Sequence, residues 1–207
     1  LLALEKGIKN LARHHKNIQE HYGLPCIVCI NHFTHDTDAE INLLMEKVRA
    51  MGGQPVLATH WADGGAGAEE LARAVVDSVD NHPGRHRYVY DEDLSIWDKI
   101  KTIASKVYGA KEITADTKIR NQIHALDEHY GHFPVCIAKT QMSFSTDPKL
   151  RGAPSGHSVE ISEVRIANGA GFIVAIAGNM MTMPGLPKAP AAENIDIDEH
   201  GNISGLF

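Results

Sequence analysis

The feature that most constrains the fold of this sequence is an unbroken apolar run, PCIVCI at residues 25–30. A strand that is apolar on both faces is typical of the middle of a parallel sheet with helices on both sides. Apolar side chains recur at helical spacing before this run, at Leu4, Ile8, Leu11 and Ile18. This spacing predicts an amphipathic helix over residues 2–21.

The alternation of helix and strand continues after the run. The segment TDAE at residues 37–40 is a capping box, which predicts the start of a helix that ends near residue 52. The segment PVLATHW at residues 55–61 predicts the next strand, and residues 68–79 predict another helix. Helices that alternate with strands are typical of an α/β fold with a parallel sheet.

The second half of the sequence continues with helices and strands in a different order. Residues 80–93 change in composition and predict either a domain boundary or an exposed crossover. Two predicted helices follow, the first capped by Ser95, and then a short buried strand at residues 133–139. Two β-rich runs joined by Asn168-Gly169 predict a hairpin. We therefore expect a second α/β unit.

Composition and charge argue against several classes of protein. The net charge is −6 with the signs well mixed, which argues against a surface for nucleic acid or an anionic membrane. No apolar run approaches the roughly 20 residues that span a bilayer, and the N-terminus has no secretory pattern. We expect a cytoplasmic protein. Because the chain begins at Leu1, we also expect a segment of something longer or a processed product.

The cysteines and histidines raise the question of a redox or metal site. Cys26 and Cys29 form a C-x-x-C inside the predicted strand, where alternation sends the two side chains to opposite faces. We interpret both as buried structural residues, with a redox or zinc pair as the alternative. The 13 histidines contain no H-E-x-x-H and no paired Cys/His spacing, and we predict no metal site.

Two loops follow the predicted strands, and each contains one large aromatic residue. In an open α/β sheet, ligands bind outside the carboxyl ends of the strands. Phe33 lies in the loop 31–37 and Trp61 in the loop 60–67. If the two strands are neighbours, opposed rings form a slot for a planar heterocycle, which each ring stabilises by on the order of 1 kcal/mol. The alternative is that both rings cover a strand edge.

Polar and small residues beside these rings complete the candidate site. The carboxylate of Asp36 can accept hydrogen bonds from the N–H groups of a pterin-like or purine ring, and Asn31 can donate and accept. Thr37 is interpreted as a helix cap that borders the site. Gly64 and Gly65 leave room beside the indole ring.

A further polar group stands at the end of the predicted strand 133–139. It contains Lys139 and Gln141. Its position is compatible both with a contribution to a ligand site and with an ordinary exit from strand to loop, and the sequence leaves the two open.

Several segments together resemble one known family. They are CINHFTHDTDAEI, HWADGGAGAEELA, FPVCIAKTQMSFSTDP and the ending GFIVAIAGNMMTMPGLPKAPAAENIDIDEHGNISGLF. The sequence resembles the C-terminal portion of formate–tetrahydrofolate ligase (formyltetrahydrofolate synthetase) over essentially the whole chain. The resemblance implies ATP-dependent ligation of formate to tetrahydrofolate, by way of formyl phosphate, to give 10-formyltetrahydrofolate, ADP and phosphate.

The same resemblance implies a role for the two aromatic residues and an architecture. In the family, the pterin of folate stacks between a Phe and a Trp, which correspond here to Phe33 and Trp61. The resemblance also implies that residues 1–70 complete a P-loop-NTPase-like, nucleotide-binding α/β domain and that residues 71–207 form a smaller α/β domain. It further implies a homo-oligomer of the full-length enzyme.

The sequence departs from the family in one respect. The GxxxxGK[ST] loop, with which the family binds ATP and Mg²⁺, has no match in this chain. We therefore expect the chain to supply the folate-binding part, to contain no catalytic residue and to be inactive alone. The alternative is a catalytically inactive folate-binding or assembly module.

Overall fold

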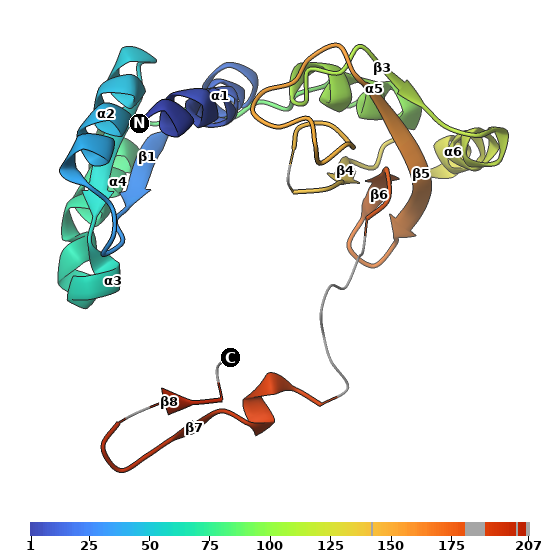
Figure 1. Cartoon of the computed structure of the whole chain (residues 1–207). Helices are drawn as coiled ribbons and strands as arrows, with labels where there is room; N and C mark the ends of the chain where they lie inside the picture. Colours follow the sequence, from blue (N-terminus) through green and yellow to red (C-terminus); the bar gives the residue numbers. More distant parts are fainter. Residues whose placement is uncertain (142, 181–188, 202, 206–207) are drawn as a thin grey trace.

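The chain folds into two lobes and a separate hairpin, which a computed structural model describes over residues 1–141, 143–180, 189–201 and 203–205 (Figure 1). We call residues 2–81 the N-terminal lobe and residues 95–178 the C-terminal lobe. Both lobes combine helices with strands, as the sequence predicts for an α/β protein. No helix in the described part of the chain combines the length and the apolar character needed to cross a bilayer.

The N-terminal lobe is built on a two-stranded parallel sheet. Its elements are α1 (Leu2–Lys16), a π-helical turn (Asn17–His21), β1 (Ile27–Asn31), α2 (Asp38–Ala50), β2 (Gln54–Ala58), α3 (His60–Asp63), a 3-10 turn (Gly64–Ala68) and α4 (Glu69–Asn81). β1 runs parallel to β2 in a register that pairs Asn31 with Ala58. The two strands therefore end at the same edge, and the loops that follow them lie close together.

The outer face of β1 differs from the prediction. The unbroken apolar run predicts burial on both faces, but burial alternates along the strand: Val28 and Ile30 are buried, whereas Cys29 and Asn31 are exposed. The prediction that Cys26 and Cys29 are both buried is therefore wrong, since Cys26 is only half-buried. The physical reason is that β1 belongs, within the described part of the chain, to a sheet of only two strands and that α1 and α2 border an open cavity at Cys29 and Asn31 instead of packing closely on them.

The C-terminal lobe holds the larger core. Its elements are α5 (Ile96–Lys106), β3 (Glu112–Thr114), α6 (Thr117–Tyr130), β4 (Val135–Ala138), β5 (Ser158–Ala167) and β6 (Phe172–Ala177). The strand order is β3-β5-β6-β4, with β5 and β6 antiparallel and both outer pairs parallel. The predicted hairpin over Asn168-Gly169 is confirmed as β5–β6. The core of this lobe contains Ile96, Ile100, Ile161 and Ile173.

Three parts of the chain differ from the prediction or were not predicted. The strand predicted over residues 55–61 ends at Ala58, and the residues after Thr59 form α3 instead. The three-residue strand β3 is too short to show a periodic pattern. The tail forms a short 3-10 turn (Ala191–Glu193) and a hairpin of β7 (Asp196–Ile197) and β8 (Ile203–Ser204), while residues 181–188 of the ending that resembles the family lie outside the described residues.

Candidate functional site

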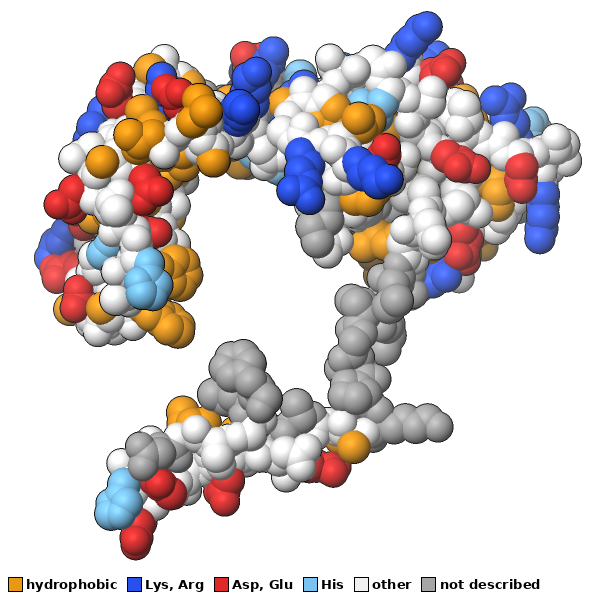
Figure 2. Space-filling model, viewed as in Figure 1, with side chains coloured by type: hydrophobic (Ala, Val, Ile, Leu, Met, Phe, Trp, Pro, Cys, Tyr) orange, Lys and Arg blue, Asp and Glu red, His pale blue; other side chains and the backbone are white. Residues whose placement is uncertain are grey.

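The two predicted aromatic residues lie together at the shared edge of β1 and β2. The ring centroids of Phe33 and Trp61 are 5.8 Å apart, with an angle of 50° between the ring planes. Both rings are open to solvent, with 45% of Phe33 and 67% of Trp61 exposed. Figure 2 shows hydrophobic side chains at this end of the N-terminal lobe, where α3 lies. Large exposed aromatic rings that contact each other are typical of an interaction site.

The loop that carries Phe33 is held in shape by its own carboxylate. The backbone N–H of Phe33 donates to Oδ2 of Asp36 at 2.8 Å, and the backbone N–H of Asp36 donates to the carbonyl oxygen of Phe33 at 3.0 Å. The capping box predicted at the following helix is confirmed, because the backbone N–H of Thr37 donates to Glu40 Oε2 and that of Glu40 to Thr37 Oγ1. The hydroxyl of Thr37 also donates to Glu40 Oε2 at 2.7 Å, and this bond, together with that from the Thr37 N–H, holds the pKa of the Glu40 carboxyl below its usual range.

The loop that carries Trp61 is compact rather than extended. The hydroxyl of Thr59 donates to Asp63 at 2.7 Å, and the backbone N–H of Thr59 donates to the carbonyl oxygen of Gly67 at 3.0 Å. A Cβ atom at Gly67 would lie 2.5 Å from the carbonyl carbon of Thr59, so the turn closes only with glycine there. Gly64 has φ of +58°, and Gly65 next to it is exposed. This turn holds Trp61 opposite Phe33.

The slot between the rings is closed in this conformation. A flat ring between two others needs about 7 Å between the outer centroids, twice the contact distance of two carbon atoms. At 5.8 Å and 50° the rings of Phe33 and Trp61 contact each other instead. A rotation of one exposed side chain about its χ angles would open the slot without a change in the backbone.

The predicted polar residues Asn31 and Asp36 line a cavity of about 260 Å³ next to this pair. It lies between α1, β1 and α2, and its other lining residues are Leu4, Cys29, Ile30, Glu40, Ile41 and Leu44. The lining therefore combines apolar side chains with the amide of Asn31 and the carboxylates of Asp36 and Glu40. Asn31, Phe33, Asp36 and Trp61 belong to one end of the N-terminal lobe.

The structure separates Lys139 and Gln141 from this group. Both line a different cavity, of about 460 Å³, between α1 and the end of β4. The ammonium group of Lys139 donates to the carbonyl oxygens of Thr140 and Ser143, and burial lowers the pKa of its side chain. The residues that follow β4 therefore contribute to a cavity, although not to the one beside Phe33.

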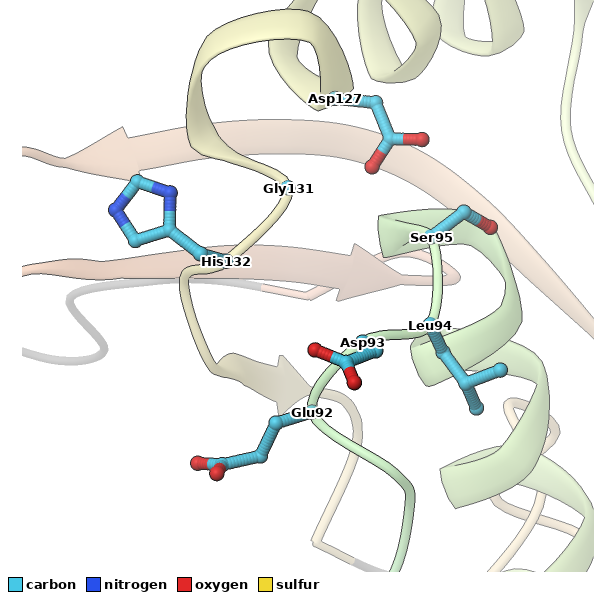
Figure 3. A pocket seen from close by; sticks show the side chains of 7 residues that line it. All are labelled: Glu92, Asp93, Leu94, Ser95, Asp127, Gly131 and His132. Carbon is cyan, nitrogen blue, oxygen red and sulfur yellow. The ribbon is translucent and has the colours of Figure 1, made fainter.

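A third hollow, of about 380 Å³, carries three carboxylates, and sequence reasoning missed it (Figure 3). Glu92, Asp93 and Asp127 line it, and Oδ1 of Asp127 accepts a hydrogen bond from the backbone N–H of Ile96 at 2.8 Å. Nearby, the side chain of Lys99 is 1% exposed and donates to the carbonyl oxygens of Gly131 and Phe133.

The carboxylates of this hollow face the charge of Lys99. Burial lowers the pKa of Lys99, and the negative charges of Asp127, Glu92 and Asp93 oppose that effect. Among the described residues, no three His, Cys, Asp or Glu side chains gather with the geometry of a metal site. The acidic run at residues 91–93 was the only signal in the sequence for this arrangement.

Comparisons with known proteins agree on one family. The sequence profile of formate–tetrahydrofolate ligase matches residues 1–207. Formate–tetrahydrofolate ligase of Methylococcus capsulatus is 65% identical over 207 residues, which are 100% of this chain and 37% of that protein. The ligases of Methylibium petroleiphilum and Sinorhizobium fredii are 54% and 52% identical over 99% and 100% of this chain, again 37% of each protein.

The chain therefore spans a little over one third of the length of the relatives it matches. The match extends over the whole of the chain, including the two aromatic loops and the strand β4 that Lys139 follows. This chain belongs to the formate–tetrahydrofolate ligase family.

Proposed function

We propose that this chain is part of an enzyme that ligates formate to tetrahydrofolate and that it supplies the folate-binding part. The single observation that carries the proposal is the contact between Phe33 and Trp61 at the shared edge of β1 and β2. Two large rings that contact each other and are open to solvent suit a flat, bicyclic ligand, once they separate, better than they suit a packing role. The names of the relatives supply the reaction class.

In the proposed complex, each residue at this edge has a definite task. Phe33 and Trp61 part to hold the two faces of the pterin ring. Oδ2 of Asp36 holds the loop of Phe33, so we assign the other carboxylate oxygen to an N–H group of the pterin. Asn31 donates to or accepts from the ring edge. Thr37 acts through its cap, which fixes the start of α2.

Gly64 and Gly65 are proposed to leave space beside the indole ring of Trp61.

The bound pterin would fix the orientation of the rest of the ligand. The protein could then hold the reactive amine of the ligand where an activated formyl group can reach it. In this proposal, N10 of tetrahydrofolate attacks the carbonyl carbon of formyl phosphate, and phosphate leaves. The chain itself contributes binding and orientation to that step.

ATP and Mg²⁺ do not fit the residues described here. The sequence contains no GxxxxGK[ST], and the described residues form no cluster of three metal-ligating side chains. We therefore propose that the part of the ligase outside these 207 residues binds the nucleotide, in a P-loop-like fold. Phosphorylation of formate would also take place there.

We also propose that the chain divides into two domains at residue 70. We further propose that the full-length enzyme assembles as a homo-oligomer and is cytoplasmic. Because α4 packs on β2, an experiment on the boundary must include residues 69–81. Limited proteolysis of the chain would locate it. Cleavage near residue 70 supports the proposed division, whereas cleavage only within residues 82–94 moves the boundary to the crossover.

The experiment that tests the proposed folate site is a fluorescence titration of the chain with tetrahydrofolate. Trp97 is replaced by Phe, so that Trp61 is the one remaining tryptophan. Trp61 is 67% exposed, so a ring that stacks on it should quench its emission strongly and saturably. An unchanged emission at saturating ligand would contradict the assignment.

The matched variant is Trp61→Ala, with binding measured by calorimetry. We expect it to weaken tetrahydrofolate binding by about 1–3 kcal/mol, as for other flat rings stacked on an aromatic side chain. Because the side chain is exposed, the free energy of unfolding should change little. Val79→Ala, which removes another exposed apolar side chain of the same lobe, is the control and should leave the affinity unchanged.

A further inference from the structure

The cavity between α1 and β4 lies where ligands bind in α/β proteins. β4 runs parallel to its neighbour β6, and Lys139 follows directly after the strand. The cavity is thus outside the carboxyl end of a parallel strand. Its other wall comes from α1, and Asn10 of that wall donates to the carbonyl oxygen of Gly152 at 3.0 Å. Residues of both lobes therefore line the cavity.

Among its described lining residues, the cavity has one cationic side chain and no acidic one. The cation is Lys139, which lines the cavity together with the imidazole ring of His14. The two carbonyl groups that accept hydrogen bonds from Lys139 orient its ammonium group but do not neutralise the charge. Lys139 is half-buried, and charged groups that lose part of their contact with water are normally paired. The described residues provide no such partner for Lys139 inside the cavity.

Arg13 adds a second positive charge behind the aromatic wall. Its guanidinium carbon is 5.3 Å from the ring centroid of Phe144, which is 3% exposed and lines the cavity. Nη1 of Arg13 is buried and has no hydrogen-bond partner among the described residues. The wall is therefore electropositive and apolar at once.

Neighbouring side chains respond to these charges. Burial lowers the pKa of His14, and the charge of Lys139 lowers it further. Burial raises the pKa of Tyr108, another lining residue, to about 12, so its phenol stays protonated and can donate a hydrogen bond. Gln141 adds an amide group. The cavity therefore presents hydrogen-bond donors next to an uncompensated cation.

We propose that this cavity binds an oxyanion group, a carboxylate or a phosphate, of a small molecule whose apolar part lies against Phe144. Lys139 supplies the charge, and Tyr108 and Gln141 supply hydrogen bonds. The site shares no lining residue with the Phe33–Trp61 pair, and its existence does not depend on the folate site.

The test is a pair of NMR titrations of the whole chain, one with inorganic phosphate and one with acetate, in a buffer that contains neither. The ring signals of His14 report on the cavity. His124 on α6, whose side chain is 83% exposed, is the internal control. We expect the His14 signals to move saturably while those of His124 do not. The anion that binds more tightly identifies the class of ligand.

Three lysine variants separate a specific site from general charge. Lys139→Met should lower the affinity for the better anion about tenfold or more, because it removes a charged hydrogen-bond donor. Lys139→Arg keeps the positive charge and should retain most of the affinity for that anion. Lys106→Met is the matched control, since Lys106 also donates to a backbone carbonyl, that of Val89 at 2.9 Å, but lies outside the cavity.

Two results would overturn the proposal. One is a shift of His14 that grows without saturation and parallels that of His124. The other is an unchanged affinity in a folded Lys139→Met variant. If Lys139→Met does not fold, the titration of the unmodified chain decides alone, because His14 and His124 are compared within one sample.

Discussion

Lys99 and Lys139 have the same local anchoring and opposite electrostatic surroundings. Each ammonium group donates to two backbone carbonyls and lies over a tyrosine ring, at 5.9 Å from the centroid of Tyr90 for Lys99 and 5.1 Å from that of Tyr108 for Lys139. Burial lowers both pKa values. Three carboxylates oppose this effect at Lys99, whereas no described carboxylate does so at Lys139.

The difference shows how to distinguish a structural cation from one that awaits a ligand. Carbonyl oxygens can hold an ammonium group in place, but carboxylates are needed to balance its charge in a region with little water. At Lys99 the protein supplies that balance. At Lys139 the balance is absent from the described residues, and an external anion is the simplest way to provide it.

The largest expected effect is on stability. Lys99→Met leaves two carbonyls without their donor and three carboxylates without their cation, and should lower the free energy of unfolding by about 2–4 kcal/mol. Lys139→Met also removes two hydrogen bonds, but it relieves an unbalanced charge, so we expect a loss of about 1 kcal/mol or less. Urea unfolding of both variants measures the difference. Equal losses in the free energy of unfolding would contradict the proposed difference between Lys99 and Lys139.

A smaller effect should follow from Asp127, which accepts a hydrogen bond from the first residue of α5 and faces Lys99. Asp127→Ala removes the acceptor of the Ile96 N–H and should cost about 1 kcal/mol, as for a lost helix cap. Asp127→Asn keeps an acceptor oxygen and loses only the charge, so its cost in the free energy of unfolding should be smaller. If the two variants lose equal stability, charge balance rather than capping is the function of Asp127.

The smallest effect concerns the titration of His14. Its pKa in the folded chain is below the ordinary value of 6.5, so the unfolded chain binds more protons between the two pKa values, and stability falls as the pH falls through that window. Lys139→Met removes the second cause of the depression, and the pKa of His14 should rise without reaching 6.5 because burial remains. NMR titration of the His14 ring measures it, with Lys106→Met as the control. No rise would mean that Lys139 does not act across the cavity.

The parts of the fold that depend on neighbouring residues were predictable from the sequence. The capping box at residues 37–40 and the hairpin at Asn168-Gly169 are of this kind, because their hydrogen bonds join residues close in sequence. The burial of β1 was not predictable, because it depends on which elements cover the strand. β3 was missed because it pairs with β5, about 45 residues further along the chain, and has no pattern of its own.

The same difference between local and long-range contacts decides which parts of the candidate site were predictable. The proximity of Phe33 and Trp61 was predictable from two neighbouring parallel strands. Their tilt was not, because it depends on the turn that Gly67 closes against Thr59. The cavity at Lys139 needs α1, which reaches it through a bond between Asn10 and Gly152, 142 residues apart in sequence. No local pattern indicates such a contact.

In the proposed folate complex, the closed contact between Phe33 and Trp61 would select among ligands. A ligand must first separate two rings that already shield part of each other from water. A flat ring that enters between them makes two ring contacts in place of one, and the gain grows with the area that the ligand covers on each ring. A bicyclic ring covers more of both rings than a monocyclic ring does, so the closed pair would favour bicyclic ligands over smaller aromatics.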